Sequence, residues 1–211
     1  MEIEIKALTP ELENDYFDFF DNRAFSDDSP YYPCYCNAFN MSKEQIAEEI
    51  FEKSKEYGGE KDDLKRALRE CAVKMVRAGR IRGYLAFADG KAVGWCNAND
   101  RLSYFRVGEF DTDDIILDEA PENSLSHGQI KSVVCFEIAP EYRGKGIATK
   151  LLERVCADAL ADGYEAVEVY PAKQTENVTL AFTGTVHLYE KAGFIPFAEK
   201  ENTLVMRKIL K

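Results

Sequence analysis

The stretch Ile138–Val155, IAPEYRGKGIATKLLERV, places a proline, two closely spaced glycines and two cationic residues between an apolar and an amphipathic segment. The preceding residues 130–138 are apolar and β-branched, which predicts a buried strand. From Ala148 onward apolar residues recur at helical spacing, and Gly163 suits the end of that helix. The sequence therefore predicts a strand, a glycine loop and a helix in direct succession.

A loop of this kind suits an anionic ligand. The first turn of a helix carries free backbone N–H groups and the positive end of the helix dipole. Glycine lets the backbone approach an anion without an intervening Cβ, and Gly144, Gly146 and Ala148 keep one face of the loop small. Arg143 and Lys145 add positive charge beside it. We therefore expect a phosphate group to bind here; the alternative is a tight strand-to-helix connection without a ligand.

The loop does not match the common nucleotide motifs. It lacks the G-x-x-x-x-G-K-[ST] pattern of a P-loop, and Thr149 stands where G-x-G-x-x-G would need its third glycine. A dinucleotide-binding fold would also need repeated βαβ units. Here a hairpin over residues 81–98, turning at Asp89–Gly90, precedes a single βαβ unit.

Other elements follow from periodicity and capping signals. Ile3 and Ile5 alternate with charged residues, which predicts a half-buried strand. Ser42 followed by Gln45 three residues later is a capping box, which predicts the start of a helix. The region Ser42–Gly79 should form two helices separated by Gly58 and Gly59. We also expect a helix over 9–21, strands over 101–107, 166–170 and 204–209, and a short helix over 185–192.

Bulk properties narrow the class of protein. The 211 residues suit one domain, and a net charge of −11 argues against nucleic acid as the main ligand. The first residues have no basic region followed by a long apolar stretch, so no signal peptide is expected. No run approaches the roughly 18 apolar residues of a membrane span. We expect a cytoplasmic protein that does not bind membranes, with its six cysteines reduced.

Two motifs resemble those of the Gcn5-related N-acetyltransferase (GNAT) superfamily. PEYRGKGIATKLL is similar to its acyl-CoA loop, [RQ]-x-x-G-x-[GA], at Arg143, Gly146 and Ala148, and LYEKAGF at 188–194 is similar to a second family signature. The resemblance implies one α/β (α+β) domain over residues 1–211 with the acyl-CoA N-acyltransferase fold. That fold is a mixed, mostly antiparallel twisted sheet flanked by helices and splayed at the CoA-binding strand. Residues 22–80 would form an enlarged helical acceptor-side region.

The same resemblance implies a function. Acetyl-CoA would be the cosubstrate, and its acetyl group would pass to a primary amine of a small molecule or protein by direct attack in a ternary complex. The pantetheine arm would run along the backbone of Phe136 and Ile138. The pyrophosphate would sit on the backbone of the loop and first helical turn: Arg143, Gly144, Lys145, Gly146, Ile147 and Ala148.

The chemistry requires a general base and a general acid. An aliphatic ammonium with a pKa of about 10.4 must lose a proton, and a thiolate with a pKa of about 8.5 must gain one. Tyr189 matches the tyrosine that in many family members protonates the thiolate; the alternative is a helix tyrosine in the core. Glu137 is the candidate base; the alternative is a surface carboxylate. In the family an asparagine that contacts CoA often stands seven residues before this tyrosine. Phe182 stands at that position here, so the sequence departs from the family pattern at this contact.

The segment PYYPCYCNAF supplies the candidate acceptor site. Its aromatic residues would surround an amine or ring, with plain core packing as the alternative: Tyr31, Tyr32, Tyr35 and Phe39. Cys34 and Cys36 are too few to bind a metal ion, so no metal is predicted.

Two other classes of function stay open. One is a noncatalytic acyl-CoA-binding or sensing module, which would keep the glycine loop without a working acid and base. The other is a metal-linked or redox sensor built on Cys34 and Cys36. The identity of the acceptor is open, and either a monomer or a homodimer is compatible with the sequence.

Overall fold

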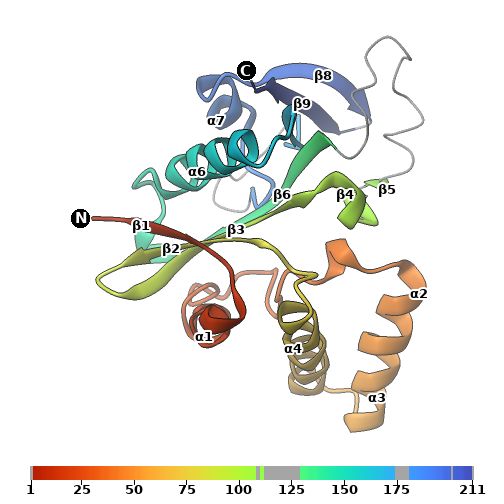
Figure 1. Ribbon diagram of the computed structural model, residues 1–211. Helices are drawn as coiled ribbons and strands as arrows, with labels where there is room; N and C mark the ends of the chain where they lie inside the picture. Colours follow the sequence, from red (N-terminus) through yellow and green to blue (C-terminus); the bar gives the residue numbers. More distant parts are fainter. Residues whose placement is uncertain (1, 108–109, 112–128, 174–180, 201, 211) are drawn as a thin grey trace.

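A computed structural model describes residues 2–107, 110–111, 129–173, 181–200 and 202–210, and it shows a sheet with helices on both faces (Figure 1). The seven strands run in the order β1-β2-β3-β6-β7-β9-β8. Only β6 and β7 are parallel neighbours; the other pairs are antiparallel. The predicted fold class is therefore confirmed. The strands are β1 Glu4–Ala7, β2 Gly83–Ala88, β3 Lys91–Asp100, β6 Ile130–Ile138, β7 Ala166–Val169, β8 Ile195–Lys200 and β9 Thr203–Ile209.

The helices form two layers (Figure 1). One face of the sheet carries α6 (Ile147–Ala161) and α7 (Val186–Lys191). The opposite face carries α1 (Glu13–Asn22), α2 (Lys43–Ile46), α3 (Lys53–Tyr57) and α4 (Lys61–Arg77). The π-helix η3 (Ala47–Glu52) joins α2 to α3, and the 3₁₀ turns are η1 Pro10–Leu12, η2 Ala38–Asn40, η4 Arg101–Ser103 and η7 Pro140–Tyr142.

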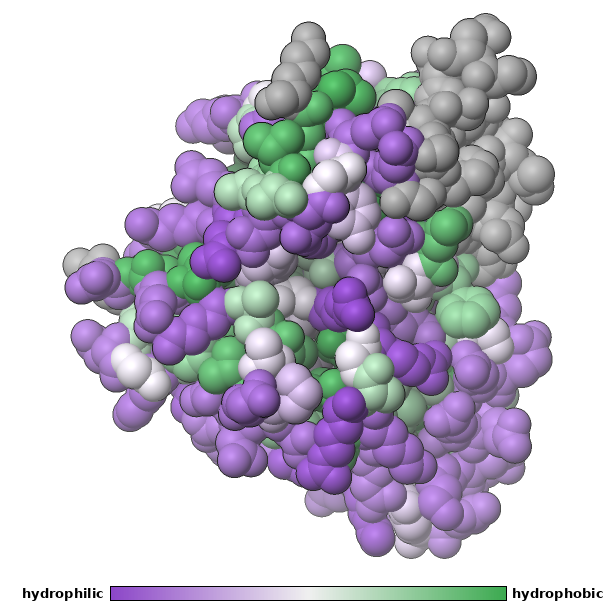
Figure 2. All heavy atoms as spheres, in the orientation of Figure 1, coloured by the Kyte–Doolittle hydropathy of each residue, from purple (hydrophilic) through white to green (hydrophobic). Residues whose placement is uncertain are grey.

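Apolar residues fill the space on both sides of the sheet. Tyr16 of α1 packs edge-on against Trp95 of β3, with a centroid distance of 4.9 Å, while Leu151 and Val155 of α6 fill the other face. The outer surface over α2–α4 is mostly hydrophilic (Figure 2). Within the described ranges every helix falls short of the length and apolarity needed to cross a bilayer.

Local signals predicted several boundaries correctly. Ser42 and Gln45 form the expected capping box, and the hairpin turns at Asp89 and Gly90, both with positive φ. The expected strand over 101–107 is wrong: residues 101–103 form η4, and a strand remains only at β4 (Arg106–Val107), which pairs with β5 (Phe110–Asp111) in a separate two-stranded sheet.

The sheet parts at the centre of β6. Residues 130–133 of β6 pair with 166–169 of β7, and no further pairing joins the two strands. At the same point the register with β3 shifts, so that Val134 is an extra residue between the pairs Ala98–Val133 and Asn97–Cys135. Such a bulge bends a strand and ends its pairing. The predicted splay is thus confirmed, and it opens one edge of the segment 135–138.

A buried ionic network joins β7 and β9. The Glu168 carboxylate accepts hydrogen bonds from Arg207 and, at 2.7 Å, from the Tyr170 hydroxyl, and Arg101 Nη1 lies 3.5 Å from it. The three charged side chains are 4% exposed or less. Buried charges are tolerated only when they are paired. Glu168 is thus a carboxylate that both buried guanidinium groups share.

We expect Glu168→Ala to lower the free energy of unfolding by about 3–5 kcal/mol, because it removes the carboxylate that two buried guanidinium groups share. Urea denaturation would measure this. Glu153→Ala, on the exposed side of α6, is the control and should change stability by less than about 0.5 kcal/mol. Equal stability of the two variants would contradict the prediction.

Candidate active site

A cavity of about 410 Å³ lies where β6 leaves β7. It is bounded by the end of β6, the glycine loop with the start of α6, the segment before α7, and the loop that follows α1. Its lining residues are Ser29, Tyr31, Phe136, Glu137, Ile138, Tyr142, Arg143, Gly144, Gly146, Ile147, Ala148, Ala181, Phe182, Gly184, Thr185 and Leu188. The splayed end of β6 and the glycine loop thus line the same cavity.

The glycine loop presents an open backbone to this cavity. Gly144 and Gly146 have φ values of 73° and 78°, and a Cβ added to either would meet no atom within 4 Å. Gly146 is the N-cap of the 15-residue α6, so the amides of Ile147 and Ala148 belong to its free first turn. Positive dipole, free amides and open space together fit an anionic group such as a diphosphate. Lys145 is not in the lining; its ammonium lies 5.1 Å from the centre of the Tyr142 ring.

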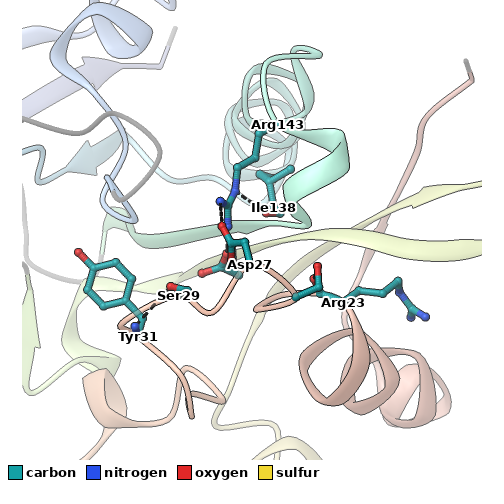
Figure 3. A network of polar contacts seen from close by, with 8 residues as sticks. Arg23, Asp27, Ser29, Tyr31, Ile138 and Arg143 are labelled. Atoms are coloured by element: carbon teal, nitrogen blue, oxygen red, sulfur yellow. Dashed lines mark hydrogen bonds and ion pairs between the residues drawn. The ribbon is translucent and has the colours of Figure 1, made fainter.

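Arg143 turns back into the protein (Figure 3). Its Nε donates to the Ile138 carbonyl at 3.0 Å, Nη1 pairs with the Asp27 carboxylate, and Nη2 lies 3.5 Å from Glu137 Oε1. The guanidinium therefore ties the loop after α1 to the end of β6. The sequence suggested that the positive charge of Arg143 would lie beside a bound phosphate. In the structure its guanidinium contacts the carboxylates of Asp27 and Glu137 instead.

Glu137 is a buried carboxyl group on the cavity wall. It is 9% exposed, and burial raises its pKa from the ordinary value of 4.5 to about 7, against the opposing effect of Arg143. A carboxyl group with this pKa is partly ionised at neutral pH and is able to accept a proton. The interpretation of Glu137 as a surface carboxylate is wrong, because the side chain is enclosed.

Tyr189 lies one layer behind the cavity wall. It is fully buried, it is not among the lining residues, and its hydroxyl donates to the Thr183 carbonyl at 2.6 Å. A Cβ on Gly184, which does line the cavity, would lie 2.4 Å from that hydroxyl oxygen. Burial raises the pKa of Tyr189 well above its usual range. The Thr183–Gly184 backbone therefore separates the hydroxyl from the cavity.

The two backbone positions expected to hold pantetheine have partners within the chain. The Phe136 N–H donates to the Phe182 carbonyl at 2.6 Å, and the Ile138 carbonyl accepts from Arg143. Phe182 thus occupies the free edge of β6 that the splay exposes. Binding of pantetheine at this edge stays a prediction, and it requires Phe182 to release the Phe136 amide.

The four aromatic residues predicted for the acceptor site separate in the structure. Only Tyr31 lines the cavity, where its ring meets Phe182 edge-on at 5.0 Å. Tyr32 lies beneath the ammonium groups of Lys61 and Lys65, and Tyr35 is buried with its hydroxyl bonded to Asp21. The Phe39 ring is tilted against that of Phe182, with a centroid distance of 6.5 Å, and it does not line the cavity. A wall built from all four rings is therefore not formed.

Three cysteines gather near Glu137. Cys36 is hydrogen bonded to both Cys34 and Cys135, and burial is among the causes that raise the pKa of each thiol. A raised pKa keeps the thiols protonated and unreactive at neutral pH. Among the described residues no cluster of three or more histidine, cysteine or acidic side chains has the geometry of a metal site. The structure gives no support to a sensor built on Cys34 and Cys36.

Sequence reasoning missed several residues of the site. Asp27 pairs with Arg143, and Ser29, Thr185 and Leu188 line the cavity. Leu188 belongs to the LYEKAGF motif and precedes Tyr189 directly, so that motif was a usable signal. The loop residues Asp27 and Ser29 had none, because no periodicity or motif marks a loop that tertiary contacts position.

The chain belongs to a known family. The model of the acetyltransferase (GNAT) family matches residues 44–194, which is more than half of the chain. Both sequence motifs lie within the matched range. The protein is therefore a member of the GNAT family of acetyltransferases. A search of curated protein sequences found no match.

Solved structures of this family share the fold. The chain aligns with a GNAT acetyltransferase from Streptococcus pneumoniae at 16% identity and a TM-score of 0.53, covering 100% of both chains. It aligns with the PaiA N-acetyltransferase from Thermoplasma acidophilum in complex with coenzyme A at 19% identity and a TM-score of 0.51, covering 99% of each. An aminoglycoside acetyltransferase in complex with coenzyme A aligns at 15% identity and a TM-score of 0.53, covering 99% of this chain and 95% of the other. At these identities the likeness is one of fold.

The raised pKa of Glu137 predicts a pH-dependent stability. Between about pH 4.5 and 7 the carboxyl group ionises in the unfolded chain but stays protonated in the folded one, so folding loses stability as pH rises. Glu137→Gln has no such group. Its free energy of unfolding relative to wild type should rise over this range by a few kcal/mol, at about 1.4 kcal/mol per pKa unit. Parallel curves in urea titrations from pH 4 to 8 would contradict a buried, protonated Glu137.

Proposed function

We propose that the chain is an N-acetyltransferase that moves the acetyl group of acetyl-CoA to a primary amine of a small molecule or protein. The main support for this proposal is a single cavity. It is lined both by an open glycine loop at a helix N-terminus and by a buried carboxyl group with a pKa of about 7. Family membership and the coenzyme A complexes of two structural relatives support the cosubstrate.

The chain's own groups suit the binding of the cosubstrate. Free backbone N–H groups from Gly144 to Ala148 would donate hydrogen bonds to the diphosphate, and the cavity volume lies within the range of small-molecule sites. The acyl arm would then enter the splay beside Phe136. Acetyl-CoA supplies an acetyl group already activated as a thioester.

Glu137 is the proposed general base. It lies on the splayed end of β6, between the glycine loop and Tyr31, whose pKa is raised by burial and further by this carboxylate. In its ionised form Glu137 takes a proton from the acceptor ammonium, directly or through a water molecule, and the freed amine attacks the acetyl carbonyl. Asp27 adds a second carboxylate at the same junction, so a cationic acceptor is favoured electrostatically.

Tyr189 is the proposed general acid, and its present position sets a condition on that role. Its hydroxyl must leave the Thr183 carbonyl and pass the Gly184 backbone to reach the departing thiolate. The same segment must release the Phe136 amide for pantetheine. One movement of residues 182–184 would meet both conditions.

The screened hydroxyl also favours a second candidate function. If residues 182–184 keep their contacts when acetyl-CoA binds, no acid reaches the thiolate, and the chain is a noncatalytic acyl-CoA-binding or sensing module. An amine panel assayed for CoA release distinguishes the two. Turnover with any amine supports the enzyme, and tight acetyl-CoA binding without turnover supports the module.

Acetyl-CoA binding should depend on the glycine loop. Gly146→Asp places a carboxylate in the open space beside the first turn of α6, and we expect affinity measured by calorimetry to fall at least about tenfold through charge repulsion. Gly163→Asp is the matched control, because its φ of 83° is also left-handed and its surroundings are also open. Equal affinity of the two variants would place the diphosphate elsewhere.

Catalysis should depend on ionised Glu137. Wild-type kcat/KM is expected to rise with pH through an inflection near pH 7 and then to level off, because only the carboxylate accepts a proton. Glu137→Gln should lower it about 100-fold and abolish this inflection, with the affinity for acetyl-CoA nearly unchanged. An unchanged inflection in the variant would mean that another group is the base.

Tyr189→Phe separates the acid from a structural tyrosine. As the acid, Tyr189 contributes to kcat alone, so the variant should lose about 100-fold in kcat while its KM for acetyl-CoA is unchanged. As a structural residue it contributes only its hydrogen bond to Thr183, about 1 kcal/mol of stability. A wild-type kcat with a lowered melting temperature would therefore rule out the acid role.

A further inference from the structure

A second cavity lies inside the helical acceptor-side region. Its volume is about 420 Å³, close to that of the active-site cavity, and the two share no lining residue. Its walls come from the helical segments between residues 37 and 68 and from β4. They are mostly apolar: Asn37, Ala38, Met41, Lys43, Ile46, Ile50, Phe51, Leu64, Leu68 and Arg106.

A π-helix forms part of the wall of this cavity. Six residues, Ala47–Glu52, have the wider π geometry, which is rare and concentrated at functional sites. Its residue Ile50 is buried, but its neighbour Phe51 stays 51% exposed. Both side chains line the cavity, and Leu64 and Leu68 of α4 line it as well, so an apolar space lies between these two helices. An apolar cavity of this size is suited to an apolar ligand.

Arg106 gives the cavity a charged end. Its Nε is buried and has no hydrogen-bond partner among the described residues. The guanidinium lies 5.9 Å from the centre of the Phe39 ring. A buried guanidinium N–H without an acceptor is costly, and a carboxylate is the acceptor that its geometry matches best. Lys43 adds a second cation to the lining, in a chain whose net charge is −11.

We propose that this cavity binds an amphipathic carboxylate: a small molecule with an aliphatic or aromatic body and one carboxylate head. The body lies among Ile46, Ile50, Leu64 and Leu68, and the head accepts hydrogen bonds from Arg106. This site is separate from acetyl transfer. Phe39 lies near a lining residue of each cavity, since its ring centre is 5.9 Å from the Arg106 guanidinium and 6.5 Å from the ring centre of Phe182.

The test measures binding alone, without acetyl-CoA, so it is independent of the proposed function. Octanoate and octan-1-ol are titrated into the protein by calorimetry, and methyl NMR signals of Ile46, Ile50, Leu64 and Leu68 report the location. Octanoate should bind at least about tenfold more tightly than the alcohol, because charge-assisted hydrogen bonds add to the shared apolar contacts. The methyl shifts should appear at these four residues.

Matched variants test the charged end. Arg106→Gln should reduce octanoate affinity to that of octan-1-ol while leaving octan-1-ol unaffected. Arg82→Gln, an exposed arginine outside the cavity, should bind both as wild type does. Ile46→Trp, which fills the cavity, should abolish binding of both.

Two binding results would overturn the proposal: no octanoate binding at millimolar concentration, or octanoate binding no better than the alcohol. It is also overturned if Arg106→Gln keeps the preference for octanoate, or if the shifts appear at active-site methyl groups such as Leu188.

Discussion

The parting of β6 from β7 is the constraint on which the rest of the site depends. The extra residue Val134 ends the parallel pairing after Val133 and leaves the backbone of residues 135–138 with only β3 as a sheet neighbour. A strand edge exposed in the middle of a sheet must find other hydrogen-bond partners. Here the Phe182 carbonyl supplies one. The same opening brings the start of α6, the glycine loop and Glu137 to a common cavity, so the geometry of the site follows from where two strands stop pairing.

The positive charge of Arg143 is paired with carboxylates of the chain itself. Arg143, which the loop motif suggests as a partner for phosphate, instead contacts Asp27 and Glu137 and holds the loop after α1 onto the end of β6 (Figure 3). The diphosphate would then be held by backbone amides and the helix dipole, which need no side-chain charge. Arg143 instead acts on Glu137, the proposed base: burial raises the pKa of Glu137, Arg143 lowers it, and the balance gives a value of about 7. The guanidinium thereby links the loop that follows α1 to Glu137 on β6.

Features encoded by neighbouring residues were predictable, and those set by distant contacts were not. The glycine loop, the capping box at Ser42 and the hairpin at Asp89–Gly90 each depend on a few adjacent residues, and all three form as expected. The strand β8 was missed because it lies at the sheet edge, contains Pro196 and alternates poorly. The burial of Tyr35 depends on contacts with α1, such as those with Tyr16 and Asp21. The screening of Tyr189 comes from the nearby Thr183–Gly184 backbone, whose path no local pattern indicates. The same holds for Phe182, whose carbonyl reaches Phe136 across 46 positions, a contact that no local pattern indicates.

A crystal structure of the protein with coenzyme A tests the central claim most directly. The account predicts a diphosphate within hydrogen-bond distance of the amides between Gly144 and Ala148. It also predicts pantetheine alongside residues 136–138, with the Phe136 N–H released from Phe182 and the thiol facing Glu137. Coenzyme A bound outside the splay, with the Phe136–Phe182 hydrogen bond intact, would contradict it.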